Sequence, residues 1–433
     1  MSTPTPEERP SSLWRHRDFM LLWSAQSTSL VGSQVTLMAL PLTAILLLQA
    51  TPMQVGLLTA AGYLPFLLVG LPAGVWVDRM RRRPILIAAD VGRTVLLLAI
   101  PAAYALGVLR LWMLYPIAFF TGILSLFFDV AHQSYLPSLV SRDQLAEGNA
   151  KLELSFSGAQ LFGPGLGGVL VQLLTAPFAI LGDAISYLVS AVLILAIRRT
   201  EPPPASDEGT AASLGEQIKE GLRYVLGHKL LRPIALTTGI GNLFDLYGMV
   251  AAILTLYAVR ELGLSPAALG GVLAAANAGS LLAATLNGRL VQRFGVGPVL
   301  AASSVVPGLA VLLLPLATPV TAVPVLVISL GLAGFAIALY NVNQITLRQT
   351  VTPDAMQGRM NATIRFLIWG TLPIGTFLGG LLGGTIGLRP TLVIAGIGST
   401  VASLPLILSS IRSLRSVPSA ELEPVATVVS ANG

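Results

Sequence analysis

The sequence contains no cysteine and little charge. Because cysteine is absent from all 433 residues, disulfide bonds and thiolate metal sites are excluded. Charged residues make up 11% of the chain, whereas about 25% is typical of a soluble domain. With 54% hydrophobic residues and a mean hydropathy of +0.78, this composition excludes a water-soluble fold and makes the lipid bilayer the main solvent.

Histidine and lysine are also scarce, which limits metal and nucleotide chemistry. The few histidines show no metal-ligand spacing, and no lysine ends a phosphate-binding loop of the form G-x-x-x-x-G-K-[ST]. We therefore expect no metal, no cofactor, no ATP hydrolysis and no other enzymatic activity. Gly163, Gly165 and Gly168 match a dinucleotide-binding pattern, but no strand precedes them and an apolar helix follows, so this interpretation is rejected.

Long apolar segments predict membrane-spanning helices, because about 20 apolar residues are enough to cross a bilayer. Hydropathy, turn residues and charge place spans near 19–48, 53–77, 84–106, 111–136, 149–174 and 177–197, and then near 233–259, 266–288, 296–316, 321–347, 361–385 and 390–411. The predicted fold is an all-α integral membrane protein with twelve transmembrane helices in two pseudo-symmetric six-helix bundles.

The spans divide the chain into four regions. We predict an N-terminal six-helix bundle at 1–200, a cytoplasmic linker at 201–230, a C-terminal six-helix bundle at 231–415 and a disordered tail at 416–433. The linker opens with Pro, Ser and acidic residues, as in flexible segments. Apolar residues at helical spacing then predict an amphipathic helix, either interfacial or simply a spacer: Leu214, Ile218, Leu222, Val225 and Leu226.

The distribution of positive charge predicts the orientation. If the N-terminus lies inside, 21 of the 26 Lys and Arg residues fall in cytoplasmic segments. Only Arg110, Arg260 and Arg389 fall outside, and Arg93 and Arg365 fall within spans. Since cytoplasmic loops carry the excess of positive charge, both termini are expected to be cytoplasmic. The net charge of +6 then reflects topology rather than nucleic-acid binding. The excess of arginine over lysine suggests a GC-rich bacterial genome, and we expect the protein in the bacterial plasma membrane.

A basic turn recurs in the two halves of the chain. Residues 74–83, Gly-Val-Trp-Val-Asp-Arg-Met-Arg-Arg-Arg, lie between apolar runs, and residues 288–295 occupy the equivalent place 214 residues later. Further matches follow in the same order: 132–143 with 343–354, Asn149 with Asn361, and Gly163, Gly167 and Gly168 with Gly375, Gly379 and Gly380. Ordered matches across loops favour a duplicated six-helix unit over a coincidence between apolar segments, and two such halves around a central site are typical of alternating-access carriers.

These residues resemble the major facilitator superfamily, and within it the twelve-helix drug/proton antiporter branch related to siderophore and macrolide exporters. The resemblance covers almost the whole chain, including patterns at 128–133 and 147–150. Gly74, Asp78, Arg79, Arg82 and Arg83 match the signature turn after helix 2, and Gly163, Pro164, Gly165, Gly167 and Gly168 are similar to the exporter motif on helix 5.

The chain departs from the family pattern in two places. Many antiporters carry an arginine on helix 4 that relays protons, but residues 118–122 contain none. Gln292 also stands where the first basic turn has a carboxylate. The resemblance therefore implies proton coupling without the usual relay arginine.

The first basic turn and the helix 5 motif have mechanical interpretations. Gly74 would allow close helix approach, and Asp78 would accept from a helix N-terminus or pair with Arg82, forming a gating latch that Asp129 joins. Alternatively, the arginines only set the topology. Glycines four residues apart, with Pro164 bending the span, would shape a gating surface on helix 5, although ordinary small-residue packing explains them too.

Ionisable residues at membrane depth indicate transport chemistry, because an unpaired charge there costs about 2.5 to 3.5 kcal/mol. Asp90 and Arg93, three residues apart, are expected to form an internal ion pair. Asp183 is expected to be structural, near the start of its span. Asp245 and Glu153 are the proton or substrate candidates, because a buried carboxyl favours its neutral form. Arg365 is expected to balance an acid or to bind an anionic substrate.

Candidate substrate contacts are polar and aromatic side chains on several spans. Polar candidates are Gln34, Asn242, Asn277 and Asn341, and aromatic candidates are Tyr63, Phe156, Tyr340 and Trp369. Mostly apolar walls favour a small amphipathic organic molecule. We expect a monomeric secondary transporter that uses the proton gradient to export drugs or secreted metabolites; the alternative is an uptake carrier or uniporter.

The latch hypothesis predicts that Asp78→Asn lowers transport at normal surface expression, because the change removes the carboxylate and little else. Uptake into vesicles, normalised to the amount of protein in the membrane, measures the effect. Unchanged transport would leave the basic turn with a topological role alone.

Overall fold

The computed structural model describes residues 12–199, 201 and 214–416. Within these ranges the side chains of Leu71, Val75, Asp78, Asp354, Ala355, Ala362 and residues 214–218 are also left undescribed. The predicted tail at 416–433, apart from its first residue, and most of the acidic and proline-rich start of the linker lie outside the described residues.

The described residues contain twelve helical spans long and apolar enough to cross a membrane, which confirms the predicted number. The first six spans are α1 (Arg17–Leu42), α2 (Pro52–Asp78), α3 (Arg82–Ala105), α4 (Leu111–Leu139), α5 (Leu145–Leu174) and α6 (Ala176–Leu195). The linker helix α7 (Leu214–Gly227) follows. The seventh span is divided into α8 (Leu231–Phe244) and α9 (Met249–Leu256), and the rest are α10 (Pro266–Phe294), α11 (Val296–Val311), α12 (Ala322–Val351), α13 (Asp354–Thr385) and α14 (Leu388–Val401) with the short α15 (Leu404–Ile407).

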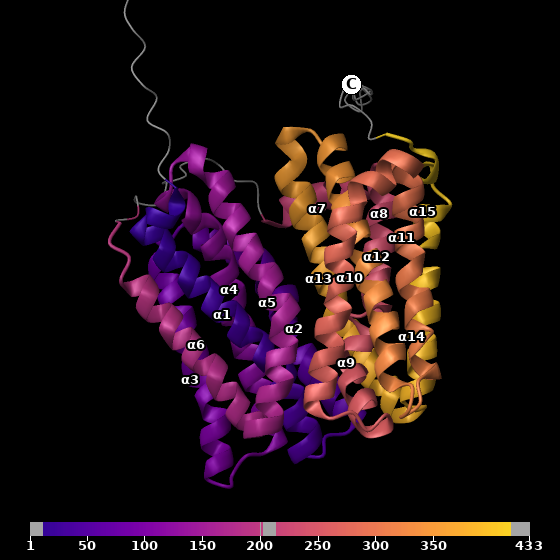
Figure 1. Ribbon diagram of the computed structural model, residues 1–433. Helices are drawn as coiled ribbons and strands as arrows, with labels where there is room; N and C mark the ends of the chain where they lie inside the picture. The colour runs from indigo at the N-terminus through magenta and orange to yellow at the C-terminus, as the bar shows by residue number, and fades with distance from the viewer. Residues whose placement is uncertain (1–11, 200, 202–213, 417–433) are drawn as a thin grey trace, which may run out of the picture.

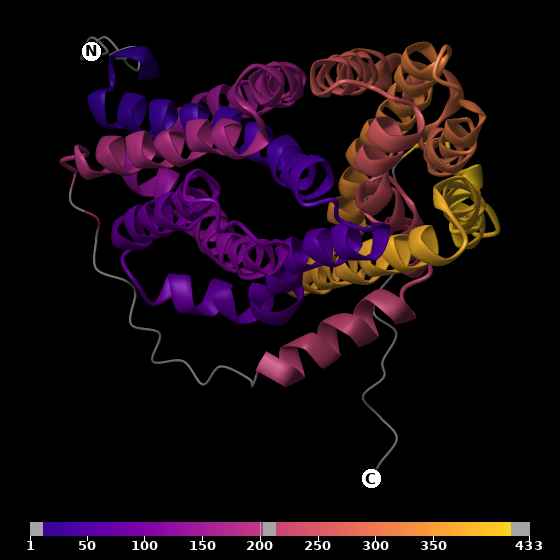
Figure 2. The same ribbon diagram turned by 90° about the horizontal axis from the view of Figure 1, so that it is seen from below.

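The spans form two bundles, α1 to α6 and α8 to α15, that lie side by side (Figures 1 and 2). We call the end of the molecule where α1 begins and α2 ends the basic end, because the arginine-rich turn between α2 and α3 lies there. The linker helix α7 lies at the same end, which is at the top of Figure 1. The other end, where α2 and α10 begin, is the opposite end.

The first span of each bundle ends in the same way. A π-helical turn, Thr43–Leu47, completes the first span, and Tyr257–Glu261 completes the seventh, 214 residues later. The next helix begins at Pro52 or Pro266, each preceded by a Thr or Ser whose hydroxyl accepts from a backbone N–H of the first turn. Proline suits the first helical position because that position needs no N–H donor. The repeat seen in the sequence thus extends to local backbone geometry.

Close contacts between glycines join the two bundles. A Cβ added to Gly56 of α2 would lie 2.6 Å from the Cα of Gly380 on α13, and one added to Gly270 of α10 would lie 3.0 Å from the Cα of Gly168 on α5. Gly56 and Gly270 hold equivalent positions in the repeat, as do Gly168 and Gly380. The two contacts are therefore a pseudo-symmetric pair, and each depends on the absence of a side chain. Figure 2 shows α2 running alongside α13.

The bundles contact each other from the opposite end to the middle of the spans. Near the opposite end the Gln172 side chain accepts from the backbone N–H of Ala267 at 3.1 Å. Near the middle Phe66 and Trp369 stack with ring centroids 4.4 Å apart. Nearer the basic end, the side chains of Asp129, Glu153 and Arg365 are exposed. This conformation is closed at the opposite end and open toward the basic end.

The glycine contacts predict that Gly168→Ala separates α5 from α10 at the opposite end, because the new methyl group would meet the backbone of Pro266 and Gly270. Overpacking of this kind costs about 1 to 3 kcal/mol. The absence of native cysteine allows a clean measurement with the pair Gln172→Cys and Ala267→Cys and a short bifunctional thiol reagent.

Cross-linking yield should fall in the Gly168→Ala background. The matched control is Gly165→Ala on the same helix, whose added Cβ would make only an ordinary 3.6 Å contact with Ala274. Equal yields in the two backgrounds would contradict a role for Gly168 in closing this end.

Candidate transport site

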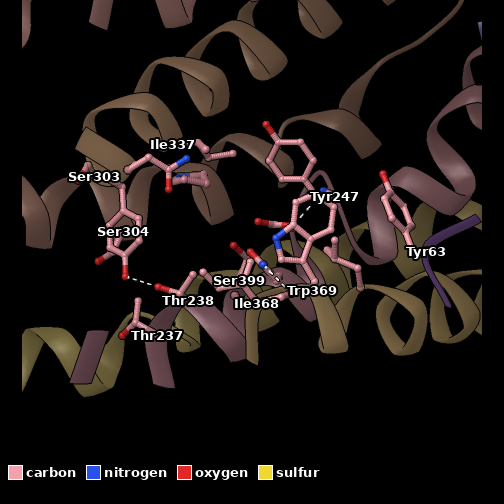
Figure 3. Close-up of a pocket in the computed structure, with 17 residues that line it drawn as sticks. Tyr63, Thr237, Thr238, Tyr247, Ser303, Ser304, Ile337, Ile368, Trp369 and Ser399 are labelled. Atoms are coloured by element: carbon pink, nitrogen blue, oxygen red, sulfur yellow. Dashed lines mark hydrogen bonds between the residues drawn. The ribbon is translucent and has the colours of Figure 1, made fainter. Parts of the chain in front are cut away.

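A cavity of about 370 Å³ lies mainly within the C-terminal bundle, between α8, α11, α12, α13 and α14, with one side chain from α2. Its volume is within the range of small-molecule sites, about 300 to 1,000 Å³. Six side chains that the sequence suggests as substrate contacts line it: Tyr63, Asn242, Asp245, Tyr340, Asn341 and Trp369. Figure 3 shows aromatic and hydroxyl-bearing side chains from different helices around one space.

Asp245 lies at a break in the seventh span. Its backbone is extended, with φ −80° and ψ −165°, between the end of α8 and the start of α9. One carboxylate oxygen accepts from the backbone N–H groups of Tyr247 and Gly248, at 2.9 and 3.3 Å. The predicted continuous helix over 233–259 is therefore wrong, because a side-chain acceptor replaces the helical hydrogen bonds lost at this point.

The break has a physical requirement and a functional meaning. Gly248 has no room for a side chain, since a Cβ there would collide with the carbonyl oxygens of Asn242 and Leu243. Irregular backbone at membrane depth is tolerated only where protein covers it or where it lines a cavity. Broken helices near the membrane midplane are typical of substrate and ion sites in carriers. The placement of Asp245, 8% exposed beside the cavity, fits this pattern.

The aromatic walls of the cavity are held in place by neighbours. Trp369 of α13 stacks on Phe66 of α2, so the indole is fixed at the contact between the two bundles. The Tyr340 hydroxyl shares a 2.8 Å hydrogen bond with Thr238 of α8. Fixed aromatic faces beside a single carboxylate suit a molecule that has both an apolar body and a polar or cationic group.

A second cavity of about 500 Å³ lies in the N-terminal bundle near the basic end, between α1, α4 and α5. It brings the exposed carboxylate of Glu153 together with Phe156 and with polar groups from all three helices. The side chains that contribute those polar groups are Gln26, His132, Gln133 and Asn149. Glu153 and Asp245 thus lie in different cavities and different bundles, so the two proton candidates do not form one site.

The other predicted contacts occupy different surroundings. The side chain of Gln34 packs over Gly163, and the Asn277 amide donates to the backbone carbonyl of Gln160 across the bundle interface. Arg365 is exposed on α13, on the side of the molecule where its charge acts on Asp129 of α4. None of these three basic or amide side chains lines the Asp245 cavity.

The basic turn is fastened to the end of its own bundle. The backbone N–H and guanidinium of Arg82 both bind the buried carboxylate of Glu201, at 2.8 and 3.1 Å. Arg83 donates to the carbonyl oxygens of Ile194 and Leu195 in the last turn of α6. The main partner of the turn, Glu201, stands in the predicted linker and was not identified from the sequence, where it has no distinguishing signal.

Two features of the predicted latch differ in the structure. Among the described residues, a Cβ on Gly74 would meet nothing within 4 Å, so the expected close helix approach at Gly74 is wrong for this conformation, in which the basic end is open. The charges that act on Asp129 are those of Arg93 and Arg365 rather than those of the basic turn. The side chain of Asp78 lies outside the described part, and the latch role of Asp78, Arg79, Arg82 and Arg83 stays a prediction.

The helix 5 motif packs against two different neighbours. Gly163 and Gly167 let α5 approach α1, where Gln34 and Val35 face them. The carbonyl oxygen of Pro164 and the Cα of Gly168 instead lie against Gly270 of α10 across the bundle interface. Gly165 makes only an ordinary contact. The motif is thus a packing element on both sides of α5, and a gating role for it stays a prediction.

Buried charges occupy the interior of the N-terminal bundle. Asp90 and Arg93 form the ion pair expected from their spacing. Asp183 lies seven residues into α6 and is fully buried beside them, deeper than its predicted place at the start of the span. Among the described residues, no three His, Cys, Asp or Glu side chains are grouped so as to hold a metal ion.

Several cavity residues were not predicted from the sequence. One is Tyr247 at the helix break. The others are hydroxyl-bearing side chains on α8, α11 and α14: Thr237, Thr238, Ser303, Ser304 and Ser399. Serine and threonine within apolar spans commonly bond to their own helix, as Ser303 does with the carbonyl of Leu300 at 3.1 Å. Their residue type therefore carries no signal that separates a cavity-lining hydroxyl from one satisfied within its helix.

Comparison with known proteins connects this geometry to a family. A family model described as "transmembrane secretion effector" matches residues 10–431. The multidrug efflux pump Tap of Mycolicibacterium fortuitum is 26% identical, over 90% of this chain and 93% of its own. The enterobactin exporter EntS of Citrobacter koseri is 28% identical, over 94% of this chain and 96% of its own.

Solved structures share the fold at low sequence identity. A bacterial homologue of the iron transporter ferroportin, in an inward-facing state, has a TM-score of 0.74 and 18% identity, covering 92% of this chain and 99% of its own. The nucleoside transporter NupG has a TM-score of 0.72 and 12% identity, covering 90% and 99%. At these identities the likeness establishes the twelve-helix architecture and nothing about substrate.

The helix break predicts different outcomes for two substitutions of Asp245. Asp245→Asn keeps an oxygen that can accept from Tyr247 and Gly248, so stability should change little. Asp245→Ala leaves the Tyr247 N–H without its acceptor and the Gly248 N–H with only the backbone carbonyl of residue 245, at about 1 to 3 kcal/mol for an unsatisfied group. Thermal unfolding of the detergent-solubilised variants measures the difference, and equal melting temperatures would contradict the structural role of the carboxylate.

Proposed function

This chain belongs to the transmembrane secretion effector family of the major facilitator superfamily, and from that membership we propose that it exports small amphipathic organic molecules in exchange for protons. It is a multi-pass membrane transporter and not an enzyme. The observation that carries the proposal is the Asp245 cavity, where one buried carboxylate at a helix break faces fixed aromatic walls. The proposed site holds the apolar body of the substrate against Trp369 and its polar group near Asp245.

Export as the direction of transport is supported by relatives. Two relatives that align over nearly their whole length are named as a multidrug efflux pump and an enterobactin exporter. The mostly apolar cavity with a few polar anchors matches an amphipathic organic molecule. We propose a substrate of that general class for this protein, with protons as the coupling ion and a monomer as the working unit.

The proposed orientation places the basic end in the bacterial cytoplasm. Cytoplasmic loops carry the excess of Lys and Arg, and the arginine-rich turn lies at the basic end together with α7. With this orientation the structure corresponds to an inward-facing conformation, closed toward the outside by the glycine contacts. Substrate would then enter from the cytoplasm or the inner leaflet, and closing the basic end would expose the site outward.

Proton coupling at Asp245 follows from competition at one carboxylate. A carboxylate beside the bound substrate attracts a cationic or hydrogen-bonding group, and a proton on the same carboxyl removes that attraction. Substrate release outside and proton release inside are then coupled because both use one group in alternate conformations. The neutral form is accommodated at the same place, since only one of the two carboxyl oxygens accepts from the backbone.

Transport in proteoliposomes tests the proposal. Purified protein is reconstituted, a proton gradient is imposed, and the movement of labelled amphipathic compounds is compared between wild type and Asp245→Asn. The variant should lower gradient-driven transport by about tenfold or more, equivalent to about 1.4 kcal/mol or more of lost driving interaction. Glu153→Gln tests the second carboxylate in parallel.

Asp143→Asn is the matched control, because Asp143 is an exposed acid in the turn before α5, away from both cavities. Substrate movement by the wild type that is independent of the proton gradient would favour the uniporter, which is consistent with the missing helix 4 arginine. Gradient-driven transport that both Asp245→Asn and Glu153→Gln leave intact would remove these two carboxylates from the coupling mechanism.

A further inference from the structure

Three charged side chains are enclosed in the interior of the N-terminal bundle, away from the Asp245 cavity. Asp90 and Arg93 project from α3 and Asp183 from α6, with exposed fractions of 0%, 3% and 0%. The group therefore contains two acids and one base. Buried ions are costly unless each is matched by an opposite charge, and one arginine can fully match only one carboxylate.

The arginine is committed to one of the two acids. Its guanidinium forms an ion pair with Asp90 on the same helix. The rings of Phe128 and Tyr187 lie over the guanidinium carbon, with centroids 4.4 and 4.0 Å away, and they hold it between α4 and α6. Within the described residues no cationic side chain lies within 4 Å of the Asp183 carboxylate. Arg93 acts on Asp183 only at longer range.

Asp183 is tightly enclosed without being fully hydrogen-bonded. One carboxylate oxygen accepts from the Ser186 hydroxyl at 3.0 Å, whereas Oδ2 has no hydrogen-bond partner in the part of the chain that the structure describes. A Cβ on Gly32 of α1 would collide with both Asp183 and Ser186, so α1 closes directly over the carboxyl group. The hydroxyl of Thr36, one turn further along α1, also faces this carboxyl. An ionised Asp183 would be a buried anion with an unsatisfied oxygen.

We infer that the Asp90, Arg93 and Asp183 cluster binds one exchangeable proton, held on the Asp183 carboxyl, and is a second protonation site in a different bundle from the substrate cavity. Adding H⁺ to Asp183 Oδ2 changes the cluster from a net charge of −1 to neutral. The Asp90 and Arg93 pair stays ionised. The balance of charges requires the proton, and the ion pair of Arg93 with Asp90, whose own Oδ2 also has no hydrogen-bond partner among the described residues, assigns it to Asp183.

The surroundings of the cluster define how the proton exchanges. The groups that face it are Ser33 and Thr36 on α1, Thr94 on α3, Ser125 and Asp129 on α4, and Ser186, Tyr187 and Ser190 on α6. Asp129 is the one acid among them whose side chain is exposed, and its charge acts on Arg93. Asp129 can therefore attract Arg93 toward the space between the bundles, and this would leave Asp90 and Asp183 to compete for the proton.

The inference deepens the proposed function, since a proton taken up here would couple the N-terminal bundle to the gradient; its test does not require transport. Infrared difference spectroscopy of the purified protein in liposomes, in H₂O and ²H₂O, detects the C=O band of a protonated carboxyl in an apolar site. The wild type should show such a band near neutral pH. Since a protonated Asp245 carboxyl would also absorb in this region, all variants are made in the Asp245→Asn background: the band should remain there, be lost when Asp183→Asn is added, and be unchanged when the exposed-turn control Asp143→Asn is added.

Asp90→Asn tests the charge balance and also serves if Asp183→Asn does not fold, as judged by size-exclusion chromatography. With Asp90 neutralised, Arg93 is free to compensate Asp183, so the band should again be lost. Asp129→Asn should keep the band and slow its exchange with ²H₂O. A band that survives in folded Asp183→Asn, or one that survives in folded Asp90→Asn, would overturn the inference.

Transport then separates this inference from the proposed function. In a proton-coupled wild type, Asp183→Asn should lower gradient-driven transport by about tenfold while substrate binding at the Asp245 cavity is retained. If the wild type shows the carboxyl band but moves substrate without regard to the gradient, the proposed function fails and the protonation site stands. If transport is proton-coupled but no band depends on Asp183, the protonation site fails and the proposed function stands.

Discussion

Two backbone contacts between glycines determine where the halves of this transporter can separate. Gly56 with Gly380, and Gly168 with Gly270, bring α2 against α13 and α5 against α10 at the same depth on either side of the pseudo-symmetry axis. Between membrane helices no hydrophobic driving force operates, so close van der Waals packing of this kind provides much of the association. The cavities, the exposed acids and the free basic end all follow from closure at one end only.

The two bundles accommodate their polar groups within the lipid environment in different ways. The N-terminal bundle encloses its charges, with Asp90, Arg93 and Asp183 shielded by aromatic rings and by the close approach of α1. The C-terminal bundle instead interrupts a helix and uses the freed N–H groups to hold Asp245 beside a cavity. Both arrangements avoid unsatisfied polar groups facing lipid. They give the duplicated halves different chemistry on a shared backbone plan.

Sequence reasoning was most reliable where the bilayer imposes a period or a length. Twelve spans, the repeat and the Asp90 to Arg93 pair follow from apolar run length and helical spacing, which depend on local sequence. Six substrate-contact candidates converge on one cavity. The polar ones could be predicted because polar side chains in apolar spans are costly without a partner or a role. The break at Asp245 was missed, since an acid and a glycine three residues apart do not by themselves end an apolar helix. Sequence could not predict the role of Glu201, the surroundings of Gly74 or the exposure of the cavity hydroxyls. These depend on which helices meet, and tertiary packing and the conformation adopted decide that.

The divided seventh span has a mechanical consequence. Gly375 and Gly379 of α13 lie directly against the backbone at Leu243 and Met249, one on each side of the interruption. These contacts pin the joint, while the segments on either side keep separate hydrogen-bond ladders. A short helix that is held at one end can tilt without deforming the helix on the other side of the break. Local tilting of α8 would thus change access to the cavity without a rigid-body movement of the whole C-terminal bundle.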